Sequence, residues 1–184
     1  MKLIIKVCTI LILILGFIFC SKEKSKVKEE ASRWIGDTLE LPRVSQVLYK
    51  DSLYRKQKLI NENPKLKVTT FIWGDCQSCV EDLKKWEHFF EFVHSKRDVE
   101  MFFYLNIQDI SFFIKNYYDN IFFKYPLIID KKLNYLTNND LPFKNKVYQT
   151  FLLDSTNKVI LVGNPIYNDK LMKLYKQEIN KRLD

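Results

Sequence analysis

The chain has 184 residues, of which 47% are hydrophobic and 15% aromatic, and its formal net charge is +8. This length and apolar content suffice for one sizeable hydrophobic core and not for two, so we expect a single folded domain. Lysines alternate with acidic residues along most of the chain, and the lack of a basic stripe argues against nucleic-acid binding.

The first residues have the pattern of an export signal. Lys2 and Lys6 precede an apolar run of 13 residues from Val7 to Phe19. A helix needs about 20 apolar residues to span a bilayer, so we favour a cleaved signal peptide over residues 1–19 rather than a permanent transmembrane helix.

Cys20 ends the apolar run, and a polar sequence begins at once with Ser21. This boundary resembles a bacterial lipoprotein signal, in which the cysteine becomes the lipidated first residue of the mature protein. Such signals usually place a small residue directly before the cysteine and Leu three positions before it, whereas this chain has Phe19 and Phe17. A cysteine that merely ends a hydrophobic anchor therefore stays as the alternative.

Both interpretations place the body of the protein outside the cytoplasm, in the cell envelope, and attach it to a membrane. Residues 20–33 are then a lipid-anchored tether that leads to the periplasm or the cell surface. We interpret residues 34–64 as an N-terminal extension and residues 65–184 as the main domain.

From residue 65 onward the sequence alternates between strand and helix patterns. Residues 66–73 are rich in strand-favouring types, residues 77–94 have helical periodicity, and residues 99–107 form a continuous apolar run typical of a buried strand. The same criteria predict a helix at 110–118, strands at 125–130, 147–153 and 158–162, and a last helix at about 168–182. This order predicts an α/β fold with a central mixed sheet flanked by helices.

The predicted helix at 77–94 has a well-defined buried face. Apolar residues recur at steps of three and four, at Val80, Leu83, Trp86, Phe90 and Val93. Charged residues fill the remaining positions, where we expect them to face solvent: Glu81, Asp82, Lys84, Lys85, Glu87 and Glu91.

The chain contains four cysteines, and two of them would be lost as thiols, Cys8 with the signal peptide and Cys20 by lipidation. The remaining pair, Cys76 and Cys79, has the spacing C-x-x-C. Secreted domains that depend on disulfides for stability normally use several distant pairs, and so short a loop restrains the unfolded chain little. We therefore interpret the pair as a site of thiol-disulfide exchange.

The position of the pair supplies a mechanism. It lies where a buried strand meets the N-terminus of an amphipathic helix, whose free amides and dipole favour a thiolate. We expect Cys76, nearer the helix end, to be the nucleophile, and the more buried Cys79 to resolve the mixed disulfide. Side chains three residues apart on a regular helix have Cβ atoms about 5–6 Å apart, so the bridge should form where the first turn is not yet fully helical.

One segment carries a family resemblance. It reads Phe71-Ile72-Trp73-Gly74-Asp75-Cys76-Gln77-Ser78-Cys79, with Leu83 and Trp86 after it. It resembles the active-site strand, loop and helix of the thioredoxin-like superfamily, in particular of its TlpA/ResA-type extracytoplasmic redoxins. The segment from Thr150 to Ile160 is similar to the hairpin of that family, and Trp34-Ile35-Gly36 resembles a motif of Bacteroidota thioredoxin-like lipoproteins.

The resemblance covers about residues 65–182 and implies a thioredoxin-like fold. It also implies a membrane-anchored extracytoplasmic thiol-disulfide oxidoreductase, with Cys76 and Cys79 as catalytic residues and without a cofactor. Its partners would be protein thiols or disulfides, together with a membrane electron donor or another thiol oxidoreductase. Residues that would tune the pair or shape its groove are Trp73, Asp75, Gln77, Ser78, Gln149 and Thr150.

Two positions depart from the family pattern or modify it. Gln149 stands where the family usually has a cis-proline facing the cysteines. Because a cis bond to another residue is costly, we expect a trans peptide and an altered groove. Asp75 precedes the nucleophile, and its carboxylate would cap the helix amides that otherwise stabilise a thiolate. We therefore expect a less stable thiolate at Cys76 and a pair that acts as a reductant.

Other functions are less consistent with these residues. A zinc site would need His88 and His94, but six residues along a helix place them on different faces, so we expect no metal. A peroxidase of the peroxiredoxin type would have Thr three residues before its reactive cysteine, where this chain has Trp73. The remaining alternative is a non-catalytic thioredoxin-like lipoprotein that binds an envelope partner, which the missing proline favours.

Overall fold

The structure is a computed structural model that describes residues 29, 31–50, 52–55, 59–61, 63–118, 121 and 123–184. The predicted signal peptide over residues 1–19, the lipidation site Cys20 and most of the tether lie outside these ranges. The chain divides into two compact units, Met1–Arg33 and Trp34–Asp184, and the second contains the strands. No helix within the described ranges is long and apolar enough to cross a membrane.

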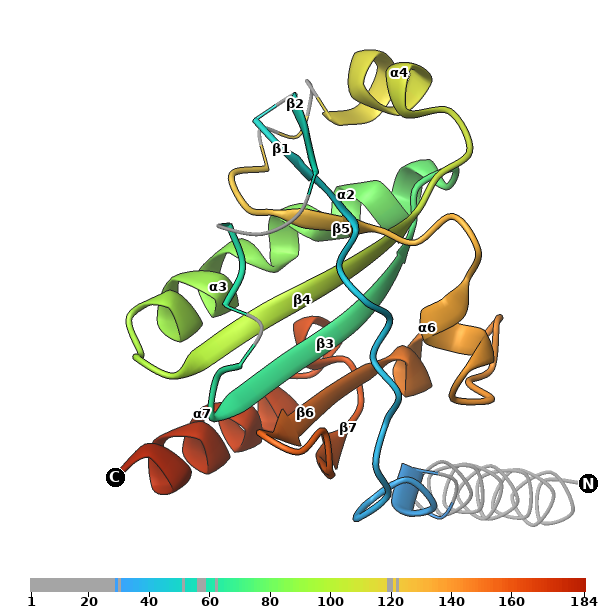
Figure 1. The fold of residues 1–184 in the computed structure, drawn as a ribbon. Coiled ribbons are helices and arrows are strands. Elements are labelled where there is room, and N and C mark those ends of the chain that lie inside the picture. The colour runs from blue at the N-terminus through green and yellow to red at the C-terminus, as the bar shows by residue number, and fades with distance from the viewer. Residues whose placement is uncertain are drawn as a thin grey trace, which may run out of the picture. The chain divides into compact units, whose positions relative to one another are not determined.

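A mixed β-sheet forms the centre of the second unit (Figure 1). Its seven strands within the described ranges are β1 (Gln46–Tyr49), β2 (Ser52–Arg55), β3 (Leu66–Trp73), β4 (Val99–Asn106), β5 (Leu127–Ile129), β6 (Thr150–Asp154) and β7 (Val159–Val162). They lie in the order β2-β1-β5-β4-β3-β6-β7. β3, β4 and β5 are mutually parallel, and antiparallel strands flank them on both sides.

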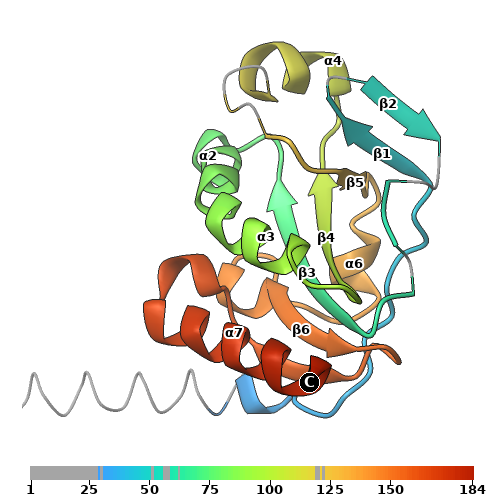
Figure 2. The ribbon, with the colours of Figure 1, turned by 90° about the vertical axis from the view of Figure 1, so that its left-hand side faces the viewer.

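Helices cover both faces of the sheet (Figure 2). α2 (Gln77–Lys85), α3 (Glu87–His94) and α7 (Asp169–Leu183) pack on one face, in a core that contains Trp86 and Phe103. The short helix α6 (Asn134–Thr137) packs on the other face, where Phe71 and Tyr135 are buried. β3 and β4 are covered on both faces, which explains their continuous apolar sequences. The predicted α/β fold is confirmed.

The predicted helix at 77–94 is divided at Trp86, which ends α2 and begins α3. Its expected apolar face is confirmed, because all five apolar residues of that face are buried. Asp82 was expected to face solvent, and this is wrong. The residue is 8% exposed and its side chain contacts Lys85 and Tyr167, because the helix turns it toward the segment that leads into α7.

Two further predicted elements differ in detail. The helix expected at 110–118 begins as α4 (Ile110–Phe113) and continues as a π-helix, η1 (Ile114–Tyr118). The strand expected at 147–153 is wrong over its first three residues. These belong to a 3-10 helix, η2 (Lys146–Gln149), which Asn145 caps through a hydrogen bond to the amide of Val147 (3.1 Å). The following hairpin is confirmed, and a 3-10 turn, η3 (Pro165–Tyr167), connects it to α7.

The predicted N-terminal extension, residues 34–64, belongs to the same compact unit as the rest of the fold. It contributes β1 and β2 to the sheet, and β1 pairs with β5. Leu39, Val44 and Val47 are buried in the same core as Phe151 of β6. The extension is thus a structural part of the fold, because its apolar residues complete one of the two cores.

Gly74 follows β3 at a place without room for a side chain. Its amide donates a hydrogen bond to the carbonyl oxygen of Asn106 at the end of β4 (2.8 Å). A Cβ atom there would overlap Cγ2 of Ile107 and lie 2.8 Å from the same carbonyl oxygen. This close approach attaches the start of the loop that carries Cys76 to the sheet.

Replacing Gly74 by Ala should destabilise the protein by about 1–3 kcal/mol, because the added methyl group forces the loop away from β4. Urea unfolding of the full chain, followed by circular dichroism, measures the free energy of unfolding. Lys84→Ala, on the exposed side of α2, is the control and should change that free energy by less than about 0.5 kcal/mol. An unchanged free energy of unfolding in Gly74→Ala would show that the loop can move without cost.

Candidate active site

The two cysteines lie between β3 and α2, as the sequence predicts. Cys76 is the residue before the helix and has an extended backbone (φ −113°, ψ 107°), whereas Cys79 is on the first turn. A disulfide joins them, with the two Cα atoms 5.2 Å apart. The bond spans the junction because Cys76 is not yet helical, and this confirms the expected geometry.

The two cysteines differ in exposure. Cys79 is 5% exposed, whereas Cys76 is partly exposed. The exposed hydroxyl of Ser78 donates a hydrogen bond to Sγ of Cys76 (3.3 Å), since a disulfide sulfur has no proton to give. Cys76 is therefore the sulfur that a partner can reach, and Cys79 lies behind it.

Asp75 does not cap α2, and that prediction is wrong. Its side chain is exposed, and the N-cap position belongs to Cys76, where no side chain among the described residues accepts a hydrogen bond from the first turn. The amides at the start of α2 therefore keep their partial positive charge next to Cys76, which favours a thiolate. The uncapped amides oppose the reductant role that we expected from an Asp75 cap.

The side chains of Gln77 and Thr150 form hydrogen bonds with residues other than the cysteines. Gln77 is exposed, and its amide donates a hydrogen bond along α2 to Oε1 of Glu81 (3.1 Å). Thr150 is buried at the start of β6, where its hydroxyl forms a hydrogen bond with that of Thr70 on β3 (2.7 Å). The first contact lies within α2, and the second joins β6 to β3.

Gln149 is buried, at 1% exposed, and all peptide bonds within the described residues are trans, as expected for Gln in place of a cis-proline. Its side-chain amide donates hydrogen bonds to the carbonyl oxygens of Pro142 (2.7 Å) and Phe143 (3.1 Å). Its Oε1 atom is buried and has no hydrogen-bond partner in the described part of the chain. Gln149 therefore fastens the segment that precedes η2.

A small recess lies beside Cys79. Its volume is about 10 Å³, which is room for about one water molecule. Cys79 lines it together with Trp73, Asp82, Lys146 and Tyr167. The recess thus brings the end of β3, the helix α2 and two segments from the second half of the chain to the buried sulfur.

Asp82 is the buried charge in this recess. Lys85 donates a hydrogen bond to its Oδ1 (2.8 Å), the hydroxyl of Tyr167 donates one to its Oδ2, and Nζ of Lys146 lies 3.5 Å from Oδ2. Burial by itself raises the pKa of Asp82, but these hydrogen bonds and the two lysine charges outweigh it and hold that pKa below its usual value. Asp82 is therefore an ionised carboxylate at neutral pH.

Tyr167 stays protonated beside that carboxylate. Burial and the adjoining negative charge of Asp82 raise the pKa of Tyr167 well above its usual value. The ammonium group of Lys85 also lies over the ring of Tyr167, 5.0 Å from its centre. These contacts keep the phenol as a hydrogen-bond donor to Asp82.

The sequence patterns missed Asp82, Lys146 and Tyr167 as members of the site. One signal for Asp82 was present, because it follows Cys79 by three residues and helical spacing places such residues on the same side of a helix. No comparable signal exists for Lys146 and Tyr167, which come from η2 and η3, far along the chain.

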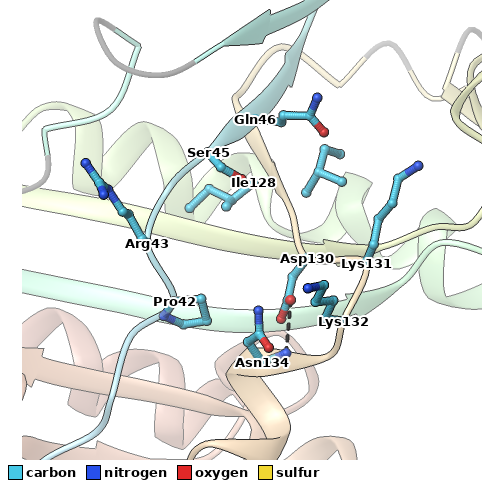
Figure 3. Close-up of a pocket in the computed structure, with 10 residues that line it drawn as sticks. Pro42, Arg43, Ser45, Gln46, Ile128, Asp130, Lys131, Lys132 and Asn134 are labelled. Atoms are coloured by element: carbon cyan, nitrogen blue, oxygen red, sulfur yellow. Dashed lines mark hydrogen bonds between the residues drawn. The ribbon is translucent and has the colours of Figure 1, made fainter.

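A larger cavity, of about 320 Å³, lies between the N-terminal extension and the segment after β5 (Figure 3). It shares no lining residue with the recess at Cys79. Figure 3 shows the charged ends of Arg43 and Lys131 pointing to opposite sides, so these cations do not converge on a common point. The buried carboxylate of Asp130 accepts hydrogen bonds from the amides of Asn134 (3.0 Å) and Tyr135 (2.8 Å) and holds the start of α6.

The described ranges contain no group of three His, Cys, Asp or Glu side chains that could hold a metal ion. His88 is exposed near Glu91, and the ring of His94 stacks on that of Phe90.

No protein-family model and no curated protein matches this sequence, but solved structures do. A solution structure from Bacteroides thetaiotaomicron, described as a candidate protein disulfide isomerase, is 16% identical with a TM-score of 0.57, over 81% of this chain and 89% of that one. A crystal structure from Chlorobium tepidum, described as a candidate thiol:disulfide interchange protein DsbE, is 12% identical with a TM-score of 0.56, over 80% of this chain and 99% of that one.

A third similar structure is a reduced 2-Cys peroxiredoxin from Plasmodium vivax. It is 12% identical with a TM-score of 0.55, over 80% of this chain and 97% of that one. At these identities the likeness concerns the fold. Because the matched structures differ in the thiol chemistry that their names state, the fold does not select one of them by itself.

Replacing Asp82 by Asn should make the Cys79 thiol titrate about one pH unit lower, because the ionised carboxylate disfavours a thiolate beside it. Ultraviolet absorbance of the thiolate against pH measures this in a full chain carrying Cys8→Ser, Cys20→Ser and Cys76→Ser. Lys146→Ala is the matched control with the opposite sign, since it removes a positive charge from the same recess. An unchanged titration in the Asn variant would show that the charge of Asp82 does not act on Cys79.

Proposed function

From the thioredoxin-like fold of this chain we propose that it is a thiol-disulfide oxidoreductase that acts outside the cytoplasm through Cys76 and Cys79. One observation carries the proposal, namely a disulfide at the junction of β3 and α2 with a reachable first sulfur and a buried second one. Exchange needs this asymmetry, because a partner must reach one sulfur while the other waits behind it. The names of the two matched structures with disulfide chemistry support the same reaction class.

In the reduced state the Cys76 thiolate attacks one sulfur of a partner protein's disulfide. A new S–S bond joins Cys76 to the partner, and the partner's other sulfur leaves as a thiolate that takes up a proton. Cys79 then loses its proton and attacks Sγ of Cys76, so the Cys76–Cys79 disulfide forms and the partner's first sulfur is released as a thiol. Two electrons have passed to the partner, and a membrane electron donor or another thiol oxidoreductase must reduce the pair again.

The two cysteines have opposite electrostatic surroundings, which suits these roles. The uncapped amides at the start of α2 favour a thiolate at Cys76, the nucleophile. The ionised carboxylate of Asp82 shares the recess with Cys79 and disfavours a second thiolate there. Cys79 is then a protonated thiol in the reduced protein. Its proton can leave through the water-sized recess once the mixed disulfide has formed.

We propose that the pair works as a reductant. Stabilisation of the reduced form raises the reduction potential, so the thiolate favoured at Cys76 acts toward an oxidant, whereas a carboxylate that disfavours a second thiolate at Cys79 acts toward a reductant. The negative charge of Asp82 disfavours a thiolate at Cys79 and so lowers the reduction potential of the pair. Lys85 and Lys146 weaken this effect, because their positive charges lie next to the carboxylate. We therefore assign to Asp82 the role of favouring a reductant, which the sequence led us to expect of Asp75.

The residues around the cysteines of this chain do not favour peroxidase chemistry. An enzyme of that type would have Thr three residues before its reactive cysteine, whereas here Trp73 occupies that position and packs on Phe71 and Phe143. The reachable sulfur of Cys76 already has a disulfide partner on the adjoining helical turn. Exchange with a protein disulfide is therefore favoured over reduction of a peroxide.

We also propose that the protein is exported and held at a membrane of the cell envelope. This proposal rests on the sequence, with a signal peptide over residues 1–19, a lipidated Cys20 and a tether over residues 20–33. The folded unit begins at Trp34, directly after the tether. Its partners would then be envelope proteins with thiols or disulfides.

Replacing Cys20 by Ser should release the protein from the membrane, because the acyl chains attached there would supply the anchor. Cell fractionation, with incorporation of labelled palmitate as a second readout, measures this. Cys8→Ser is the matched control and should change neither result. Lipidation would be contradicted, and a hydrophobic anchor favoured, if Cys20→Ser stayed in the membrane fraction and neither it nor the Cys8→Ser control incorporated label.

The redox proposal predicts a reversible Cys76–Cys79 couple with a reduction potential near that of thioredoxin, about −270 mV, or lower. Equilibration of the full chain, carrying Cys8→Ser and Cys20→Ser, with dithiothreitol or glutathione buffers measures the potential. A value near about −120 mV would identify an oxidant instead.

A test of exchange in the cell uses the chain with Cys20 intact, because Cys20→Ser would remove the proposed anchor. Cys79→Ser should trap mixed disulfides with envelope proteins through Cys76, and the double variant Cys76→Ser/Cys79→Ser should trap none. If no reversible couple and no trapped species are found, a non-catalytic thioredoxin-like lipoprotein that binds an envelope partner becomes the better explanation.

A further inference from the structure

Residues 142–147, called the Phe143 loop here, present exposed apolar side chains next to the disulfide. Phe143 is 46% exposed and Val147 is 40% exposed. The ring of Phe143 packs on that of Trp73, with ring centres 6.5 Å apart, and Trp73 lines the recess with Cys79. At the other end of the loop, Lys146 reaches Asp82 on α2. The loop is therefore held to the edge of the recess at two points.

Gln149 holds the Phe143 loop by hydrogen bonds from the protein interior. Its Nε2 atom donates hydrogen bonds to the carbonyl oxygens of Pro142 and Phe143, at 2.7 and 3.1 Å. Its own main-chain carbonyl oxygen accepts a hydrogen bond from the buried hydroxyl of Tyr135 (3.3 Å). Two hydrogen bonds to consecutive carbonyl groups leave the main chain at Phe143 little freedom, so they determine where the ring projects.

The same side chain carries a cost for folding. Oε1 of Gln149 is buried without a hydrogen-bond partner among the described residues, and such an acceptor is unfavourable. An apolar side chain of similar length would avoid this cost but would lose both contacts with the loop. Stability alone therefore does not explain the amide at this position, whereas placement of the loop does.

A partner polypeptide must cover this surface during exchange. The mixed disulfide joins the partner's cysteine to Sγ of Cys76, which brings the residues beside that cysteine onto the edge of the recess. Large exposed apolar side chains there are Tyr167, which lines the recess, and Phe143, which packs on the lining residue Trp73. Covering them removes apolar surface from water, which is favourable when the partner is apolar as well.

We infer that Gln149 is a positioning residue for the Phe143 loop, and that this loop makes the protein favour partner cysteines flanked by apolar side chains. The inference rests on the proposed function, because it assigns the substrate class of the same site. It also explains how the chain shapes its groove at a position where related redoxins are expected to use a cis-proline.

Two synthetic cysteine peptides, each activated as a mixed disulfide with thionitrobenzoate, test the inference. One carries Leu and Phe beside its cysteine, and the other carries Ser and Gly. The protein is the full chain with Cys8→Ser, Cys20→Ser and Cys79→Ser. Its Cys76 thiolate attacks the peptide sulfur, thionitrobenzoate leaves as a coloured anion, and mass spectrometry verifies the protein–peptide disulfide. This parent should react about tenfold faster with the apolar peptide.

Gln149→Met keeps the side-chain length but removes both donors, and it should reduce the preference to less than about threefold. Phe143→Ala should do the same. The double variant should keep the same residual preference for the apolar peptide as either single variant, because both changes remove the same contact. The polar peptide reports the reactivity of Cys76 itself and should react at an unchanged rate. Gln177→Met, on the exposed side of α7, is the matched control and should keep the full preference.

Each contrary outcome has a separate meaning. An undiminished preference in Gln149→Met, or an equal loss of rate toward both peptides, overturns the positioning role. Equal rates for the two peptides in the parent overturn the substrate class and leave the proposed function standing. If Cys76 attacks neither peptide, the proposed function fails and the inference fails with it.

Discussion

The hydrogen bond from the amide of Gly74 to the carbonyl oxygen of Asn106 sets the geometry of the site. It joins the ends of β3 and β4 where a side chain would collide with Ile107. β3 is buried along most of its length, so its end is firmly placed, and the chain must turn within the three residues 74–76 to enter α2. Cys76 is thereby left extended at the helix N-terminus, and Cys79 is carried inward on the first turn. The different accessibility of the two sulfurs follows from this main-chain contact.

The two cysteines also differ in the charges that surround them. The start of α2 has no side-chain cap, so its amides act on Cys76, while the carboxylate of Asp82 lies one turn beyond Cys79. A buried carboxylate is costly unless it is paired, and Lys85, Lys146 and Tyr167 supply that pairing from α2, η2 and η3. The segments that surround the recess are therefore held together by their contacts with one buried carboxylate, which lines the recess together with the buried sulfur.

The fold is shared with structures named for different thiol chemistries, so the function of this chain must come from its own residues. Trp73 and the Phe143 loop form an apolar edge beside the reachable sulfur, and the buried amide of Gln149 fixes that edge. In the proposed exchange reaction this edge would contact the partner polypeptide. Gln149 thus holds the Phe143 loop from the position where the family resemblance led us to expect a cis-proline.

The sequence by itself determined the fold class, the order of most elements and the cysteine pair, because these depend on patterns local in the chain. The buried runs of β3 and β4 and the three-to-four periodicity from Val80 to Val93 are such patterns. Only the tertiary structure decided that Asp82 is buried, that Asp75 does not cap α2, that η2 replaces the first residues of a strand, and that the amide of Gln149 holds the Phe143 loop. The physical reason is that the contacts of Asp82 with Lys146 and Tyr167 join residues far apart in the chain, so that the chain must fold before those charges and hydrogen bonds exist.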